Sequence, residues 1–465
     1  MRTHAAFWGL AGLLALPACA DDIVAPSAPP PKILSAIAAA NPRNVLSAVV
    51  IVRLESAHSA EVRYRGGAEP DGVAPAVRTS GDSVVVPVLG LAAETAYDFV
   101  AVAHGAGQAV MSEPISFVTG ALPEDLPAYA AGGADPSPGF VAFSAGPYGL
   151  VVDNGGRVVW YHRFEGGAGL NFQAQPTGRY AAVPPPTGDG EPPRWIEIDP
   201  LGNVTRTFGC APGFTVRFHD LLADPDGSYW LLCDETRTMD LSALGGVADA
   251  RVTGTGVQHV SGDGALLFRW SPFDHFDIAD LDPAARAGPM VNWTHGNALD
   301  RDAAGNLLLS FRSLGEITSI DSRTGDVLWR MGGTRNEFEF GFDGVSTPAF
   351  AWQHGLRTTG EGSLILLDNR GDPAESRAER YEFDAGARTA RRVASYGSLP
   401  PVVALLGGTT QPLPGGRALV SFGNGGRVEE YDASGNVVWS IDQPGYVFRA
   451  QRIASLYRPG VGTPR

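Results

Sequence analysis

The stretch NWTHGNALDRDAAGNLLLSFR (residues 292–312) alternates in polarity, passes through a turn and ends in an apolar run, an order that predicts a β-hairpin. Its first arm carries His295 and Asn297, which lie two residues apart and are therefore expected on one face of a strand. With the turn centred near residues 303–304, antiparallel pairing sets Arg312 opposite His295. The hairpin is thus expected to bring an imidazole, an amide and a guanidinium together.

This hairpin belongs to a pattern that repeats from about residue 121 to residue 465. One unit, an acidic or Gly-rich turn followed by a short β run, recurs six times, beginning at residues 153, 199, 261, 321, 384 and 432. A second unit alternates with it, as in DPDGSYWLLCD, AAGNLLLSFR and PGGRALVSFGN. Two hairpins per period give four strands, which is the blade of a β-propeller. The sequence therefore predicts an all-β protein with a six-bladed β-propeller over residues 121–465.

The composition is that of a turn-rich, acidic protein of 465 residues. Its 59 glycines and 36 prolines favour short strands joined by turns over long helices. A formal net charge of −15 argues against a general nucleic-acid-binding protein, which would need a basic face to displace counterions. A small anionic substrate is still compatible, because a local pocket of Arg and His can exist in an acidic protein.

Residues 1–18 have the layout of an export signal, with Arg2 followed by the apolar run AAFWGLAGLLAL, which is too short to span a bilayer. The tetrad LPAC (residues 16–19) is similar to the lipobox of bacterial lipoproteins, in which cleavage before the cysteine precedes lipidation of its thiol. An ordinary signal peptide cut near Ala20 is the alternative. We expect an exported lipoprotein, periplasmic or at the cell surface, anchored to a bacterial membrane through Cys19.

A Pro-rich linker over residues 19–31 leads to short β runs over residues 32–120, whose spacing predicts a small β-sandwich. Within this region LAAETAY (residues 91–97) resembles the corner of fibronectin type III domains, where a tyrosine tethers the crossover between the sheets. Tyr97 would be that tyrosine. Because the region carries no catalytic cluster, we expect it to act as a spacer or docking domain.

Two further cysteines, Cys210 and Cys233, lie near strand ends that flank one predicted hairpin. Export to an oxidising compartment would permit a disulfide between them. The sequence leaves open whether the two residues pair or stay as free thiols.

Three of the nine histidines occupy one equivalent position in three successive repeats. His219, His295 and His354 each precede a turn glycine at nearly the same spacing, and those glycines are Gly227, Gly305 and Gly362. A single histidine is more often a core residue, but three unrelated core histidines would rarely coincide in this way. Since the first strand of each blade lines the central channel, we expect the three imidazoles to face that channel.

The predicted neighbour of His295 indicates the chemistry of the site. A cation such as Arg312 beside a histidine lowers the pKa of the imidazole and keeps it neutral and nucleophilic. The planar guanidinium also suits an anionic tetrahedral group. Neutral histidine, arginine and amide donors together indicate a site that transfers an anionic group.

At these residues the sequence resembles the bacterial arylsulfate sulfotransferase family. The motifs NWTHGNAL…LLLSFR, WQHGL…LILLDN and IDSRTGDVLW carry the resemblance, which covers the chain from about residue 31 to its end. Members of the family are exported proteins with a small β-sandwich followed by a six-bladed propeller. The resemblance implies sulfuryl transfer from an aryl sulfate to a phenol in a ping-pong cycle, without a nucleotide cofactor or a metal.

The same resemblance implies a role for each motif residue. The histidine of QHGL, His354, is the expected nucleophile and forms a sulfohistidine. The THxN pair corresponds to His295 and Asn297, the arginine after the next strand to Arg312, the first-blade histidine to His219, and, more loosely, a channel threonine to Thr410. A general acid and base at the phenolic oxygen would be either His219 or His295, and the sequence does not choose between them.

Two other functions fit parts of the pattern. Three histidines could bind Zn²⁺ in a hydrolase, with Asp220 or Asp368 orienting them, although Arg312 would repel the cation. A non-catalytic propeller that binds a ligand or scaffolds partners is the second alternative, and it predicts no turnover. The segments DNGG and DPDG resemble pieces of Ca²⁺ loops, but their context indicates hairpin turns.

Overall fold

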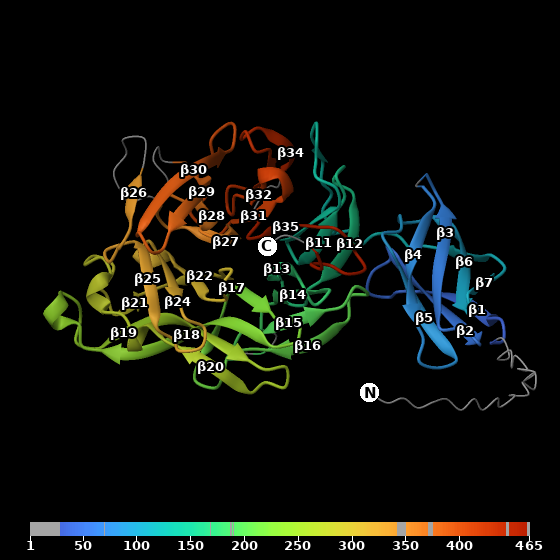
Figure 1. Ribbon diagram of the computed structural model, residues 1–465, viewed down its shortest axis with the longest axis horizontal. Helices are drawn as coiled ribbons and strands as arrows, with labels where there is room; N and C mark the ends of the chain where they lie inside the picture. Colours follow the sequence, from blue (N-terminus) through green and yellow to red (C-terminus); the bar gives the residue numbers. More distant parts are fainter. Residues whose placement is uncertain are drawn as a thin grey trace, which may run out of the picture.

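The computed structural model describes residues 28–465 except 69, 168, 187, 189, 342–349, 371–374, 443–445 and 463–465. The described residues form an all-β protein in which a β-sandwich, blue in Figure 1, stands beside a larger assembly of sheets. Short 3-10 helices lie in its loops: η1 (Ser242–Leu244), η2 (Pro272–Asp274), η3 (Ile278–Asp280), η4 (Arg312–Leu314) and η5 (Pro414–Gly416). The predicted signal segment and Cys19 lie outside the described residues. Within the described part of the chain, no helix has the length and hydropathy needed to cross a membrane.

The N-terminal part is a sandwich of two antiparallel sheets. One sheet contains β1 (Lys32–Ala40), β2 (Ser47–Glu55) and β5 (Ser83–Leu89). The other contains β4 (Gly72–Arg78), β3 (Ser59–Gly66), β6 (Ala96–Gly105) and β7 (Gln108–Met111), with β8 (Ile115–Val118) also on β6. Alternate residues of β2, such as Val50 and Val52, are buried in the core that the sheets share, as the period of a half-buried strand requires. The Tyr97 hydroxyl accepts a hydrogen bond from the Ala92 amide at 2.8 Å, which is the tether predicted from the sequence.

The rest of the described chain forms six sheets, each with a four-stranded antiparallel core. The first contains β10 (Phe140–Ala145), β11 (Tyr148–Val152), β12 (Val158–Arg163) and β35 (Ala450–Ile453). The second contains β13 (Leu170–Gln175), β14 (Arg179–Val183), β15 (Trp195–Ile198) and β16 (Val204–Phe208). The third contains β17 (Thr215–Ala223), β18 (Tyr229–Met239), β19 (Ala250–Val260) and β20 (Leu266–Trp270), with β21 (Met290–Asn292) added to β19.

The remaining three sheets follow the same plan. The fourth contains β22 (Gly296–Arg301), β23 (Leu307–Phe311), β24 (Glu316–Ile320) and β25 (Val327–Gly332). The fifth contains β27 (His354–Gly360), β28 (Ser363–Asp368), β29 (Arg377–Asp384) and β30 (Thr389–Gly397), with β26 (Glu339–Gly341) on its outer edge. The sixth contains β31 (Thr409–Leu413), β32 (Arg417–Ser421), β33 (Arg427–Tyr431) and β34 (Val437–Asp442), with β9 (Ala131–Gly132) on β34.

The inner strands of these sheets contact one another in order, β35, β13, β17, β22, β27 and β31, and β31 returns to β35. The C-terminal strand β35 pairs with β10, so the two ends of the repeat region complete one sheet together. The second sequence unit includes the turn between the inner strand and the strand beside it, and β35 has no such turn because it comes from the other end of the repeat region. Hydrogen bonding of β35 and of β9 closes the ring from both ends of the repeat region.

The hydrophobic core of the ring is divided into six clusters, one between each pair of neighbouring sheets. Large aromatic side chains anchor these clusters, and Trp160, Trp195, Trp293 and Trp439 are fully buried. Replacing one of them by alanine is expected to cost roughly 3–5 kcal/mol, because the loss of buried surface is combined with a cavity. The sheets therefore hold one another in place, and each inner strand is fixed relative to its neighbours.

The acidic turns between strands are hairpin turns, as the sequence indicates. In the turn between β22 and β23, the Asp302 carboxylate accepts from the amides of Ala304 and Asn306 at 2.9 and 2.8 Å. Gly305 has φ +87°, a conformation that favours glycine, and its amide donates to the Asp302 carbonyl. The side chain and the glycine together reverse the chain, with no requirement for a cation.

Cys210 and Cys233 form a disulfide with their Cα atoms 6.0 Å apart. Cys233 lies in β18, and Cys210 follows β16, so the bridge joins the segment between the second and third sheets to the second strand of the third sheet. The pairing that the sequence left open is therefore made.

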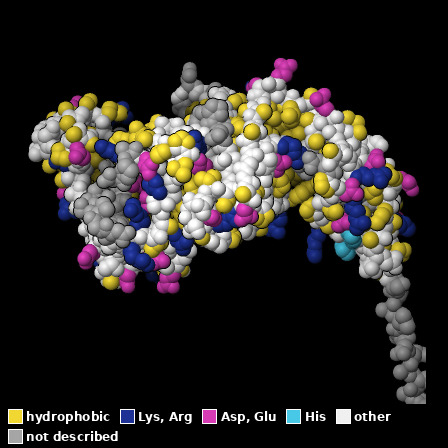
Figure 2. Space-filling model, turned by 90° about the horizontal axis from the view of Figure 1, so that it is seen from above, with side chains coloured by type: hydrophobic (Ala, Val, Ile, Leu, Met, Phe, Trp, Pro, Cys, Tyr) yellow, Lys and Arg dark blue, Asp and Glu magenta, His cyan; other side chains and the backbone are white. Residues whose placement is uncertain are grey.

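The sandwich is attached to the ring through its loop at residues 41–46. The buried Asn44 side chain donates to the Tyr161 carbonyl at 3.2 Å, and the Tyr161 hydroxyl accepts from the Val45 amide at 3.1 Å. Asn41 donates to the Leu201 carbonyl at 2.8 Å. On the face drawn in Figure 2, acidic and basic side chains are interspersed over the molecule and do not gather into a broad field of one sign.

Candidate active site

The structure brings together the three histidines that occupy equivalent positions in the repeats. His219 lies in β17, His295 immediately precedes β22, and His354 is the first residue of β27, so they belong to the inner strands of three consecutive sheets. The ring centroid of His219 lies 5.2 Å from that of His295 and 5.9 Å from that of His354. The side chains of His219 and His354 are buried. Sequence reasoning expected this convergence from the repeat alone.

The environment of His354 fixes which of its ring nitrogens carries hydrogen. Its Nδ1 atom lies 2.9 Å from the Trp352 carbonyl oxygen and 2.8 Å from Oδ1 of Asn369. The Asn369 amide nitrogen donates to the carbonyls of Ala404 and Gly407, so its oxygen must face the histidine. Both partners of Nδ1 are acceptors, and Nδ1 therefore carries the hydrogen. The lone pair of the neutral ring is left on Nε2.

Burial, with smaller effects from the nearby Arg312 and Arg217, lowers the pKa of His354 to about 4 against the opposing effect of the Asn369 hydrogen bond. At neutral pH the ring is therefore uncharged, with an unprotonated Nε2 atom. This is the state that a nucleophilic imidazole requires.

The partner of Nδ1 in His219 is a hydrogen-bond donor, whereas the partners of Nδ1 in His354 are acceptors. The Arg217 Nε atom donates to His219 Nδ1 at 3.0 Å, and Arg217 is itself held by Asp234 at 3.2 Å. Sequence reasoning missed Arg217. The available signal was its spacing in the segment VRFHD, two residues before the histidine on the same strand. Burial, followed by the charge of Arg217, lowers the pKa of His219 well below its ordinary value.

His295 and Arg312 are cross-strand neighbours, as the hairpin register predicted. The Arg312 amide donates to the His295 carbonyl at 3.1 Å. Burial, Arg217, Arg312 and His354 lower the pKa of His295 to about 2. The Arg312 guanidinium lies over the ring of Trp352, 4.4 Å from the centroid, at the segment that leads into His354. Arg312 therefore contacts both the backbone of His295 and the segment that precedes His354.

The regular alternation that would place His295 and Asn297 on one face does not extend across this segment. His295 has φ +49°, β22 begins only at Gly296, and its pairing with β23 is irregular between Gly296 and Ala298. The Asn297 amide nitrogen donates to the Gln353 carbonyl at 2.5 Å, while its buried Oδ1 atom has no hydrogen-bond partner among the described residues. Asn297 therefore fixes the chain one residue before His354.

The buried Thr410 hydroxyl donates to the Gly355 carbonyl at 2.7 Å, so this threonine contacts the backbone that follows His354. The hydroxyl of the neighbouring Thr409 is also buried, and it has no hydrogen-bond partner in the described part of the chain. Thr410 lies beside the cluster with its hydroxyl engaged in holding β27.

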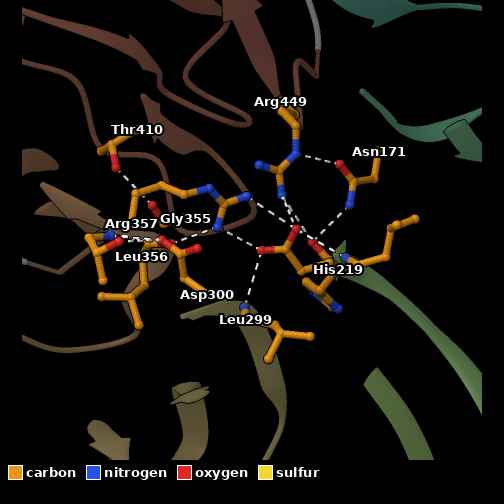
Figure 3. A network of polar contacts seen from close by, with 12 residues as sticks. Asn171, His219, Leu299, Asp300, Gly355, Leu356, Arg357, Thr410 and Arg449 are labelled. Atoms are coloured by element: carbon orange, nitrogen blue, oxygen red, sulfur yellow. Dashed lines mark hydrogen bonds and ion pairs between the residues drawn. The ribbon is translucent and has the colours of Figure 1, made fainter. Parts of the chain in front are cut away.

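Asp220, the residue that follows His219, belongs to a buried network of ion pairs. The Asp220 carboxylate accepts from Arg357 at 2.8 and 3.1 Å and from Arg449 at 3.0 Å, and all three side chains are buried. Figure 3 shows Arg357 and Arg449 within this network of polar contacts. Asn171 donates to the His219 carbonyl at 2.8 Å and accepts from Arg449 at 2.5 Å. These contacts join four of the inner strands or their immediate ends and fix the backbone of the histidine.

The same network bears on the metal-site alternative. Asp220, one of the two carboxylates that could orient a metal-binding histidine, is already bound by two guanidinium groups. Asp368, the other, accepts from the backbone amides of Ala351 and Arg370. Across the residues that the structure describes, His, Cys, Asp and Glu side chains form no group of three arranged to hold a metal ion.

Comparison with known proteins identifies the family. Residues 208–444, which include the three histidines and Arg312, match the model of the arylsulfotransferase (ASST) family. The chain belongs to the arylsulfotransferase family. No curated protein is significantly similar to it in sequence.

Solved structures similar to this chain are distant. A protein of unknown function from Bacteroides caccae is 13% identical, with 68% of this chain and 98% of that chain covered and a TM-score of 0.44. A virginiamycin B lyase from Staphylococcus aureus is 10% identical, with 63% and 72% covered and a TM-score of 0.33. A protein from Lactobacillus plantarum is 10% identical, with 84% and 98% covered and a TM-score of 0.36. These likenesses are too weak to support an argument about function.

Proposed function

We propose that this arylsulfotransferase moves a sulfuryl group from an aryl sulfate to a phenol through a sulfohistidine at His354. The observation that carries the proposal is the hydrogen-bond pattern of His354, whose Nδ1 atom has two acceptors, so that the lone pair of the neutral ring is on Nε2. Membership of the family supports the reaction class. A nucleophile that is also a good leaving group divides a difficult transfer into two easier steps.

In the first step, Nε2 of His354 attacks sulfur, an N–S bond forms, and the S–O bond to the aryl group breaks with its electron pair on the phenolic oxygen. The ring then carries a positive charge, and Nδ1–H remains bonded to Asn369 and the Trp352 carbonyl. In the second step, the oxygen of a second phenol, whose proton goes to solvent, attacks sulfur; the N–S bond breaks with its electron pair on Nε2, and the imidazole is neutral again. Arg312 is the proposed donor to the sulfuryl oxygens, where one well-placed donor can contribute about 3 kcal/mol.

The test is incubation with 4-nitrophenyl sulfate, with and without phenol. We expect phenol to accelerate nitrophenol release, and we expect the peptide that contains His354 to gain the mass of one sulfuryl group when phenol is omitted. His354→Ala should show neither result. His259→Ala is the matched control, since His259 stacks on Trp230 and contacts Ser228 in the third sheet. Absence of both release and labelling in the folded wild-type protein would favour the non-catalytic ligand-binding alternative.

We propose further that residues 121–465 form a six-bladed β-propeller and that residues 32–120 form a fibronectin type III-like sandwich. The six sheets, each with a four-stranded antiparallel core, and the six clusters between them support the propeller. Two packed antiparallel sheets and the Tyr97 tether support the sandwich. In such a propeller the histidine cluster lies at the central channel, where side chains from several blades meet.

Export and attachment to a membrane through Cys19 remain a proposal from the sequence. The supporting feature is the lipobox-like tetrad at residues 16–19. Labelling of cells with an alkyne-tagged fatty acid should mark the protein, and Cys19→Ser should lose the label. Secretion of an unlabelled wild-type protein would instead support an ordinary signal peptide.

A further inference from the structure

The hydrogen bond between Arg217 and His219 determines the protonation state of a second histidine in the cluster. A guanidinium can only donate, so Nδ1 of His219, 3.0 Å from Arg217 Nε, must accept with its lone pair. In the neutral ring the hydrogen is then on Nε2. Asp234 binds Arg217 at 3.2 Å and accepts from the Thr255 hydroxyl at 2.6 Å, so the guanidinium is itself held in place.

The surroundings of His219 disfavour a positive ring. Its side chain is 5% exposed and packs against Phe218, with centroids 4.3 Å apart, and against Phe448, at 5.5 Å. The charged and titratable groups that face it from the elements around it are Arg217 on β17, Arg312 on η4, His295 before β22 and His354 on β27. The carboxylates of Asp234, which holds Arg217, and of Asp220, the next residue, are already bound to guanidinium groups. In the described part of the chain, no carboxyl group hydrogen-bonds to any of the three rings.

The cluster therefore offers hydrogen bonds but no readily transferable proton. A neutral imidazole that donates from Nε2 can polarise an oxygen, but losing that hydrogen would leave an imidazolate, which is very basic. His354 cannot be the acid either, because its Nδ1–H is bonded to Asn369 and its Nε2 atom is the nucleophile. Burial and the cations Arg217 and Arg312 keep the His295 ring neutral as well. An oxygen that leaves sulfur in this site must carry its negative charge away.

We propose, on the basis of the sulfuryl transfer proposed above, that Arg217 is a positioning residue. It holds His219 as the neutral ring with hydrogen on Nε2, so the aryl group leaves as a phenolate that accepts a hydrogen bond, and not a proton, from His219. The S–O bond breaks with both electrons on the phenolic oxygen, and any proton reaches that oxygen later from solvent. By microscopic reversibility the acceptor attacks as its phenolate, having lost its proton to solvent. The substrate class is therefore aryl sulfates of acidic phenols as donors and ionised phenols as acceptors.

The kinetic test uses a series of aryl sulfates, from 4-nitrophenyl sulfate to phenyl sulfate, with 1-naphthol as acceptor. In a ping-pong cycle kcat/KM for the donor reports only the formation of the sulfohistidine. We expect this value in the wild type to fall roughly fivefold or more for each unit by which the pKa of the released phenol rises. In Arg217→Glu, assayed at pH 5.5, the dependence should weaken to roughly twofold or less per unit, because a carboxylate beside Nδ1 favours a protonated His219, which can then donate its proton.

Two variants separate this role from a structural one. Arg217→Lys keeps a cation and a donor beside His219, so the steep dependence should return. Arg237→Gln removes another ion-paired arginine of the same sheet, bound to Glu235 at 2.6 Å, and should leave the dependence unchanged. If Arg217 were only structural, its replacement would slow all donors by the same factor. A shallow dependence in the wild type would overturn the inference while sulfation of His354 could still be observed.

A measurement without turnover tests the same assignment. In protein labelled with nitrogen-15 at histidine, the His219 signal, identified by its loss in His219→Gln, should show an unprotonated Nδ1 and a protonated Nε2. The reverse pattern in the folded wild type would overturn the role of Arg217, whatever the activity. If the predicted pattern is found but no donor is turned over, the proposed function fails and the hydrogen-bond assignment stands.

Discussion

His354 and His219 stand at corresponding places on the inner strands of the fifth and third sheets, with their rings 5.9 Å apart, yet their hydrogen bonds are opposite. The Nδ1 atom of His354 has two acceptors, whereas Nδ1 of His219 has a donor. In the neutral rings, Nε2 of His354 therefore carries a lone pair, and Nε2 of His219 carries a hydrogen that it can donate. The comparison teaches that the repeat places a histidine, but the side chain beside it decides whether the ring attacks or polarises.

The largest expected effect comes from removing the attacking ring. His354→Ala should reduce kcat for transfer from 4-nitrophenyl sulfate to phenol on the order of 10⁴-fold or more, as loss of a nucleophile does in other enzymes that form covalent intermediates. Initial rates check this, with circular dichroism to confirm the fold. Near wild-type transfer by a folded His354→Ala protein would contradict the difference in role between the two histidines.

The next effect concerns the buried ion pairs of Asp220, the residue that follows His219. Asp220→Asn leaves Arg357 and Arg449 buried without their carboxylate, which should lower the free energy of unfolding by roughly 3–5 kcal/mol. Urea denaturation measures the loss. The matched control is Asp82→Asn, whose partner Arg53 is exposed, and this change should cost no more than about 1 kcal/mol. Equal losses in the two variants would show that the buried network does not hold the site.

Low pH should destabilise the folded protein, because both His354 and His219 are neutral in it. Their pKa values are lowered in the folded protein, so the unfolded chain binds more protons between the ordinary histidine pKa and the folded one. The free energy of unfolding should therefore fall as the pH drops from 6.5 to about 4, where His354 alone would account for roughly 3 kcal/mol. Urea denaturation at pH 7 and pH 4.5 measures this. His354→Gln should lose less stability than the wild type over that range, and an equal loss would exclude a buried neutral His354.

A smaller effect should follow from changing the partner that distinguishes His354. Asn369→Ala removes one of the two acceptors of Nδ1 but leaves the Trp352 carbonyl. We expect kcat to fall on the order of a hundredfold, less than for loss of the nucleophile, because an orienting group acts through the ring that it holds. KM should change little. Asn306→Ala, at a hairpin turn, controls for loss of an asparagine. An unchanged kcat would show that the Trp352 carbonyl alone fixes the ring.

Much of the fold could be predicted because it depends on local patterns that recur. The turns with aspartate and glycine occur where the sequence units place them, and the strands follow within a residue or two. The register of the His295 hairpin was also local, since the turn length sets Arg312 opposite His295. The prediction that His295 and Asn297 lie on one face of a strand was based on regular alternation. That alternation does not hold at His295, which has a positive φ.

Other parts of the site could not be predicted, because their partners lie far apart in the sequence. Arg357 and Arg449 reach Asp220 from residues separated by 137 and 229 positions. Asn369 approaches His354 from the loop after the next strand. Arg217 was closer, but its bond to a ring nitrogen depends on the irregular pairing of β17 with β18 between Val216 and Leu221.

By itself, the sequence determined that the chain repeats a two-hairpin unit, that three histidines share one position in that unit, and that an arginine faces one of them. Period-two alternation and turn chemistry are local, so they can be recognised without coordinates. The tertiary structure decided that Nδ1 of His354 carries hydrogen and that Nδ1 of His219 does not. Those states depend on side chains that meet only when the sheets close into a ring, and a difference of one hydrogen-bond partner gives two otherwise equivalent histidines different chemistry.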